Sequence, residues 1–158
     1  MIDFHYQASD AAATRRIGRT GVISPVDLQV MSAGMGTGDD ASISVNAHQR
    51  SINQRGYNLV AIDPASGDQL WSDNFDTFAS PEASGRLARA IERLPAGTIV
   101  AAAVKDEASN QLTAAAVAAL RSLGGQEDIR GRYRVSHLLI GVKGARPAPR
   151  SSEPVTRG

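Results

Sequence analysis

The chain has 158 residues, of which 42% are hydrophobic and 21% charged, and its formal net charge is +1. This length fits one domain, and the composition is that of a folded globular protein rather than a disordered one. The balanced charge gives no electrostatic reason to expect nucleic acid or an anionic membrane as a partner. The chain has no cysteine, which excludes a disulfide framework and a thiolate metal site.

The sequence also lacks the patterns of a membrane protein. No apolar run approaches the roughly 20 residues that cross a bilayer, so we expect no membrane span. Residues 1–5 show neither the basic start nor the apolar core of a signal peptide. We therefore expect that the chain stays in the cytoplasm, leaves it by another route, or is processed.

The first part of the chain predicts an arm followed by two strands. Residues 1–21 have no clear periodicity and are interpreted as a mobile N-terminal arm, with a docking segment as the alternative. Residues 22–33 alternate between apolar and polar side chains, as does the run 41–46, which is typical of half-buried strands. The glycine-rich residues 34–40 match no phosphate-binding spacing and are interpreted as a loop between these strands.

The stretch 55–77 is predicted to be a hairpin around which the rest of the chain is organised. Residues 57–62 form a mostly apolar, partly β-branched run that suits a strand with much of both faces covered. Residues 63–68 (DPASGD) combine Asp, Pro and Gly in the manner of a tight turn, and the chain then resumes as a second strand. Trp71, the only tryptophan, is interpreted as a packing residue of that strand rather than as a ligand-stacking one.

The remaining elements are two helices and two strands. Ser80 and Pro81 are typical of a helix start, and Thr113 is predicted to cap a second helix. Residues 98–104 form a continuous apolar run that predicts a central strand, and 135–142 predict the last strand. Residues 146–158 are rich in Pro, Ser and Arg and predict a disordered tail.

This order of elements predicts an α+β fold. Strands cluster early in the chain and two helices follow, which favours antiparallel pairs with helices packed alongside. One or both of the helical connections could instead create a parallel neighbour.

The residues do not assemble a catalytic signature. The three histidines, His5, His48 and His137, lack the close spacing of metal ligands, and His137 is interpreted as a packed, hydrogen-bonded core residue. Asp73 and Asp76 are an alternative acid–base pair, but two acids at a strand end are more typical of solvated or turn positions. A scattered Ser-His-Asp triad stays open. We expect a protein that is not an enzyme and has neither a metal nor a cofactor.

Several motifs resemble one known family. Arg55-Gly56, Phe75-Asp76-Thr77, Lys105-Asp106-Glu107 and the glycine-terminated runs 120–124 and 141–144 occur in the order found in the interleukin-like EMT inducer domain, also called the PANDER-like domain. The resemblance covers about residues 24–145 and is that of a bacterial-type member. It implies a compact ββα domain over residues 22–145, in which two mainly antiparallel sheets are flanked by two or three helices.

The resemblance also implies a ligand. In one family context, the stem of a glycosyltransferase, the domain binds a terminal N-acetylglucosamine through two arginines and an aspartate. The matching positions are Arg55, Asp106 and Arg134, with Tyr133 and Lys105 nearby. An aspartate accepts hydrogen bonds from sugar hydroxyls, and an arginine donates several N–H bonds in a fixed fork. The alternative is that these charged residues form a structural ion-pair network at the rim of the sheet.

The sequence thus predicts a non-enzymatic module that binds an N-acetylhexosamine-type glycan at a polar sheet rim. The second hypothesis is an accessory subunit that docks into a larger assembly through its termini. A hydrolase is the weakest hypothesis. By resemblance the protein is extracytoplasmic or on the cell surface.

Overall fold

The computed structural model describes residues 12–17, 22–34, 40–125, 127–133, 135–144 and 155–157. In chain order its elements are β1 (Ala12–Arg16), β2 (Ile23–Val30), β3 (Ala33–Gly34), β4 (Ile43–Val45), β5 (His48–Gln49), β6 (Gly56–Ile62), β7 (Gln69–Phe75), α1 (Pro81–Glu92), β8 (Ile99–Asp106), α2 (Ala114–Arg121), β9 (Val135–Val142) and β10 (Val155–Arg157). The strands form one sheet in the order β1-β2-β4-β5 and a larger one in the order β10-β9-β8-β6-β7, in which β3 also pairs with β8. The predicted α+β class is confirmed.

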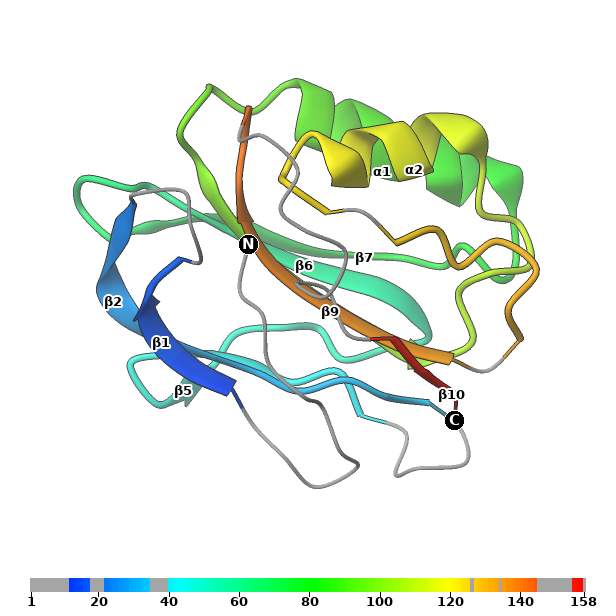
Figure 1. The fold of residues 1–158 in the computed structure, drawn as a ribbon, viewed down its shortest axis with the longest axis horizontal. Helices are drawn as coiled ribbons and strands as arrows, with labels where there is room; N and C mark the ends of the chain where they lie inside the picture. The colour runs from blue at the N-terminus through cyan, green and yellow to red at the C-terminus, as the bar shows by residue number, and fades with distance from the viewer. Residues whose placement is uncertain are drawn as a thin grey trace.

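The described elements are arranged in three layers. Figure 1 shows α1 and α2 above the large sheet, and β1, β2 and β5 below it. Because side chains alternate across a strand, each central strand contributes to two cores. Leu59 and Ala61 pack in the cluster with the helices, whereas Val60 and Ile62 pack in the cluster with β2 and β4. This double burial explains why β6 is mostly apolar.

The predicted hairpin is confirmed. β6 and β7 pair antiparallel, with Tyr57 opposite Phe75 and Ala61 opposite Trp71. The Asp63 carboxylate accepts hydrogen bonds from the backbone N–H groups of the two residues that follow Pro64, at 2.8 and 3.0 Å. Trp71 is partly buried and lies edge-on to Phe75 with ring centroids 6.5 Å apart, as expected of a packing residue.

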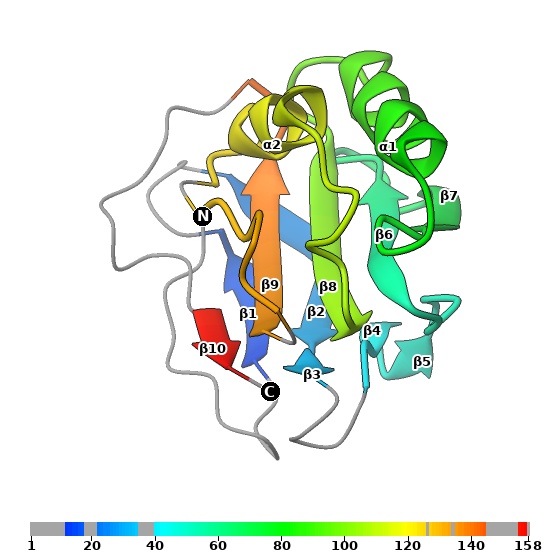
Figure 2. The ribbon, with the colours of Figure 1, turned by 90° about the vertical axis from the view of Figure 1, so that its right-hand side faces the viewer.

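Both helices begin where the sequence predicts. The Ser80 hydroxyl accepts a hydrogen bond from the N–H of Ala83 at 3.1 Å, and the Thr113 hydroxyl accepts one from Ala116 at 3.3 Å. β8, which follows α1, pairs antiparallel with β6, and β9, which follows α2, pairs antiparallel with β8 (Figure 2). Neither helix connection therefore creates a parallel neighbour, and the one parallel pair among the described strands joins β3 to β8.

Two short strands lie in segments for which the sequence predicts an arm and a tail. β1 pairs antiparallel with β2, and Ile17 beside it is fully buried. β10 pairs antiparallel with the first residues of β9. Both strands pair at the edges of existing sheets, where an alternating apolar pattern is not required, so their residues carry little strand signal in the sequence. Residues 1–11 and 18–21 of the arm, and residues 146–154 and 158 of the tail, lie outside the described part.

β3 pairs with β8 at the point where the pairing of β8 with β9 ends. The β8–β9 ladder runs to Ala103 and Leu138, and beyond it β3 lies beside Lys105 and Asp106. Ser32 closes the junction: its hydroxyl donates to the carbonyl of Val104 at 2.6 Å and accepts from the N–H of His137 at 3.1 Å. Gly34, which the sequence assigns to a loop over residues 34–40, therefore belongs to β3. Residues 35–39 lie outside the described part.

Candidate functional site

The start of β6 and the ends of β7 and β8 meet at one end of the large sheet. The β6–β8 register pairs Gly56 with Lys105, so that its continuation places Arg55 beside Asp106. The β6–β7 register pairs Tyr57 with Phe75, which brings Asp76 to the same end. We call this end of the sheet, with Arg55, Asp76, Phe78, Lys105 and Asp106, the rim.

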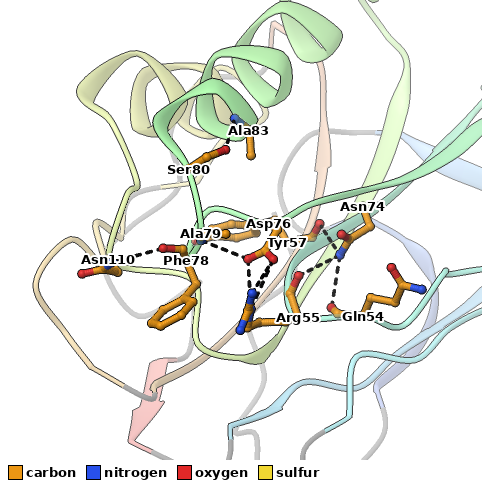
Figure 3. Close-up of polar contacts among 10 residues, drawn as sticks. All are labelled: Gln54, Arg55, Tyr57, Asn74, Asp76, Phe78, Ala79, Ser80, Ala83 and Asn110. Carbon is orange, nitrogen blue, oxygen red and sulfur yellow. Dashed lines mark hydrogen bonds and ion pairs between the residues drawn. The ribbon is translucent and has the colours of Figure 1, made fainter.

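Arg55 is held in place by a neighbouring carboxylate and an aromatic ring. Its Nε and Nη2 both donate to the Asp76 carboxylate, with Nη2 2.7 Å from Oδ2. The guanidinium carbon lies 4.5 Å from the centre of the Phe78 ring, within the range of a cation–π contact. Figure 3 shows the guanidinium between Asp76 and Phe78. Because the arginine side chain is still 41% exposed, it is oriented without being buried.

The electrostatics of the rim follow from this pairing. The hydrogen bond to Asp76 raises the pKa of the Arg55 guanidinium, and the negative charge of Asp106 raises it as well. Burial raises the pKa of Asp76, but hydrogen bonds from Arg55 and from the Ala79 N–H outweigh it, so this pKa lies below its ordinary value. Both groups are therefore charged at neutral pH.

Asp106 is the last residue of β8 and has an unusual backbone conformation. Its φ is +60°, in the left-handed region that aspartate tolerates better than most residues. The residue is partly buried, and its charge acts on Arg55 across the rim. Strained backbone of this kind is concentrated at ligand-binding positions. The structure thus brings Arg55 and Asp106, two of the predicted site residues, to the same end of the sheet.

Lys105 has an internal partner. Its Nζ donates to the backbone carbonyl of Asn53 at 3.1 Å. Asn53 also has a positive φ, of 61°, and its side chain bonds the Asp40 carboxylate at 2.7 Å and the N–H of Ala41 at 2.8 Å. Lys105 therefore ties the chain before β6 to β8, and its ammonium group is only partly available to a ligand.

The end of β8 continues into a well-anchored loop. Glu107 is 3% exposed, and its carboxylate accepts hydrogen bonds from the N–H and hydroxyl of Ser109 and from the N–H of Asn110. The Asn110 side chain donates to the carbonyl of Phe78 at 3.1 Å (Figure 3). The acidic residue after Asp106 thus organises the loop that supports the Phe78 segment.

The chain that leads into β6 is fixed by two side-chain amides, of the half-buried Asn74 and the buried Asn58. Asn74 Nδ2 donates to the carbonyls of Gln54 and Arg55 at 3.1 and 3.0 Å (Figure 3). The fully buried Asn58 side chain exchanges hydrogen bonds with the backbone of Gln54, at 3.0 and 2.7 Å. These contacts fix the backbone at Arg55, while Asp76 orients its guanidinium.

The last two predicted site residues precede β9. Tyr133 is 58% exposed, so it presents most of its surface to solvent two residues before that strand. Arg134 lies outside the described residues. The sequence did not indicate that Asp76 and Phe78 contact Arg55 or that Asn53 contacts Lys105. The Phe-Asp-Thr motif contains Asp76, but the pairing of Asp76 with Arg55 depends on the strand register.

His137 is a core residue, as predicted. It is 1% exposed, and its Nδ1 lies 2.8 Å from the hydroxyl of Tyr57. Among the described residues there is no group of three or more His, Asp or Glu side chains that could hold a metal ion. Asp73 is exposed and Asp76 is paired with Arg55, which does not favour the acid–base interpretation of these two residues.

A small α+β domain with a charged sheet rim is the class that these observations define. Residues 55–145 match the family described as interleukin-like EMT inducer, and the chain belongs to this family. The match begins at Arg55 and contains the β6–β7 hairpin, both helices, β8 and β9.

Curated relatives are vertebrate proteins. The chain is 36% identical over 96 residues to the human cell migration-inducing and hyaluronan-binding protein, and 35% identical to its mouse counterpart. It is 34% identical over 116 residues to the zebrafish cell surface hyaluronidase. The alignments cover 61–73% of this chain but only 7–8% of these relatives. Neither helix in the described part of the chain is long and apolar enough to cross a membrane.

Proposed function

We propose that this protein is a non-enzymatic carbohydrate-binding module and that the rim recognises an N-acetylhexosamine-containing glycan. The observation that carries the proposal is that a half-exposed Arg55, oriented by Asp76, lies at the same end of the sheet as Asp106 and within the influence of its charge. Two relatives are named for hyaluronan binding and a third for a hyaluronidase, and hyaluronan contains N-acetylhexosamine units. The bacterial origin expected from the sequence stays a prediction.

The chemistry of the rim supports a polyhydroxylated ligand. Asp76 occupies Nε and Nη2 of Arg55, and within the described part of the chain Nη1 has no hydrogen-bond acceptor. Because Asp76 holds the whole guanidinium in place, Nη1 keeps its direction when the ligand arrives, which lowers the entropic cost of binding. Asp106 supplies the complementary acceptor for a hydroxyl or amide N–H.

The neighbouring residues have separate proposed roles. Tyr133 offers an exposed ring against which a sugar can pack, and Arg134 would add a second guanidinium. Lys105 acts mainly by positioning, because its ammonium group bonds the Asn53 carbonyl. An extracytoplasmic or cell-surface location is supported by the relative that is named as a cell surface hyaluronidase.

The test is a glycan array probed with the wild type and two variants. Asp106→Gly removes the carboxylate without straining the backbone, because glycine adopts a φ of +60° readily. Asp73→Ala is the matched control, since it removes an exposed carboxylate from the neighbouring strand β7. The proposal predicts binding by the wild type and by the control and its loss in Asp106→Gly. Equal binding by all three proteins would contradict it.

A second candidate function follows from the lengths of the relatives. The chain corresponds to 7–8% of each of them, so in those proteins the domain is one part of a larger polypeptide. A domain that works as one part of a larger polypeptide is also suited to be an accessory module that docks into an assembly of separate chains. This candidate predicts co-purification with a defined partner that survives Asp106→Gly, whereas glycan-mediated capture would not survive it.

A further inference from the structure

A groove lies at the other end of the β6–β7 hairpin. It encloses about 360 Å³. Its lining residues are Val26, Val45, Asn46, His48, Arg50, Gly67, Asp68 and Gln69. The volume is near the lower end of the range for small-molecule sites, which begins at roughly 300 Å³. β6 has seven residues, so the groove lies roughly 20 Å from Arg55 along the strand.

One side of the groove is the turn between β6 and β7, which packs directly on β2. Gly67 has a φ of +79°, and a Cβ at this position would lie 2.7 Å from Cγ1 of Val26. The backbone N–H of Asp63 donates to the carbonyl of Asp68 at 2.9 Å and closes the turn. The missing side chain at Gly67 therefore permits the close approach that gives the groove its floor.

The other side is the turn between β4 and β5, which is also fixed to β2. Asn46 and Ala47 both have positive φ, of 49° and 67°, as in the two-residue loops of tight β-hairpins. The side-chain oxygen of Asn46 accepts from the N–H of Asp27 at 2.9 Å, and its N–H donates to the carbonyl of Asp27 at 2.9 Å. Since both sides are anchored to one strand, the groove exists before any ligand binds.

The lining combines an apolar floor with both kinds of hydrogen-bonding group. Val26 and Val45 are each 7% exposed and form the floor. Around them stand the exposed cation of Arg50, the exposed carboxylate of Asp68 and the polar side chains of Asn46, His48 and Gln69. With the histidine neutral, the formal charges of the lining cancel.

We infer that this groove is a second binding site and that it takes an uncharged, polyhydroxylated ligand, a neutral saccharide unit. A hydroxyl group both donates and accepts, so neighbouring hydroxyls need the donors and acceptors that Arg50 and Asp68 supply together. The C–H face of a pyranose ring can cover the two valines. A carboxylate or phosphate would be attracted by Arg50 but repelled by Asp68, which makes an acidic ligand a poorer match.

The experiment follows backbone amide signals of the isotope-labelled full chain by two-dimensional NMR during titration. The probes are methyl β-D-glucoside and, as acidic arms, D-glucuronate and inorganic phosphate. The inference predicts that the glucoside at millimolar concentrations shifts the signals of His48, Asp68 and Gln69. Because a hydrogen bond to a charged group contributes about 1.5–3 kcal/mol, Asp68→Ala and Arg50→Ala should each weaken binding about tenfold or more. Asp73→Ala, on the same hairpin outside the groove, should bind like the wild type.

The variants must fold for their binding to be compared with that of the wild type. Arg50 and Asp68 have exposed side chains, and the spectra of the variants report directly whether they fold. Stronger shifts with glucuronate or phosphate than with the glucoside would overturn the inference, as would no shift in the groove at tens of millimolar glucoside. Shifts confined to Arg55 and Asp106 would also overturn it while supporting the proposed function of the rim, so that the two proposals fail separately.

Discussion

Replacing Gly56 with alanine tests how the rim is built. Gly56 has a φ of +101°, and a Cβ placed on it would lie 2.3 Å from the carbonyl oxygen of Phe75 and 2.9 Å from Cα of Asp76. Both are backbone atoms of the adjoining strand end, so no side-chain rotation relieves the clash. Only a displacement of β6 from β7 can make room, and this would separate Arg55 from Asp76.

The magnitude has two parts. The left-handed backbone costs an alanine roughly 1–2 kcal/mol. The clash adds about 1–3 kcal/mol, as is typical for an overpacked interior position. We therefore expect Gly56→Ala to lower the free energy of unfolding by about 2–5 kcal/mol, a large fraction of the roughly 5–15 kcal/mol that stabilises a typical domain.

Gly97→Ala is the matched control. Gly97 has a φ of +93°, close to that of Gly56, but a Cβ there would meet no heavy atom within 4 Å. It should therefore show the conformational cost alone. Urea unfolding followed through the fluorescence of Trp71 gives both free energies by linear extrapolation. Gly56→Ala should cost at least about 1 kcal/mol more than Gly97→Ala; equal costs would refute the close approach of the two strands.

Three further outcomes follow from the same contacts. A double-mutant cycle of Arg55→Ala and Asp76→Ala should give a coupling of up to about 1 kcal/mol that weakens with salt, because the side chains are 41% and 32% exposed; a coupling of 3 kcal/mol or more would contradict this. Ser80→Ala should destabilise the protein by about 1 kcal/mol in urea through loss of the bond to the Ala83 N–H, and a neutral result would show that the cap does not contribute. The pKa of Asp76 is lower in the folded than in the unfolded state, so the pair contributes stability above pH ~4 that is lost as the pH falls through the folded-state pKa. Acid titration of unfolding should show a smaller loss of stability in Asp76→Asn than in the wild type; an identical loss would exclude this origin.

The sequence predicted the elements whose signals are local. Ser80 with Pro81 and Thr113 are capping residues, and each helix begins beside its cap. The turn 63–68 contains its own hydrogen-bonding carboxylate, so the hairpin could be located without knowledge of the rest of the fold. The mostly apolar runs in β6 and β8 likewise indicated burial on both faces, which the two cores confirm.

The elements that the sequence did not predict depend on distant partners. β1 and β10 are each added to the edge of a sheet, and β3 is a two-residue strand in the gap between β8 and β9. Short edge strands need backbone partners more than a particular side-chain pattern, so their residues give little signal.

The rim was predicted in part. Arg55 and Asp106 were named through family motifs, and the strand register places them at the same end of the sheet. The partner of Arg55 was not foreseen, because Asp76 is 21 residues away and reaches it only through the pairing of β6 with β7 and the conformation of Gly56. Lys105 was expected to face a ligand, but it bonds the carbonyl of Asn53. Asn53 has a positive φ that no sequence pattern predicted.

The most direct test of glycan recognition at the rim is the side-chain Nε–H signal of Arg55 during titration with N-acetylglucosamine. This hydrogen is held against Asp76 in the absence of ligand and should give a resolved NMR signal. If the rim binds the sugar, this signal should move with saturation in the wild type and in Asp73→Ala, and it should stay in place in Asp106→Gly. A signal that does not move in the wild type, or that moves equally in Asp106→Gly, would contradict recognition by this pair of residues.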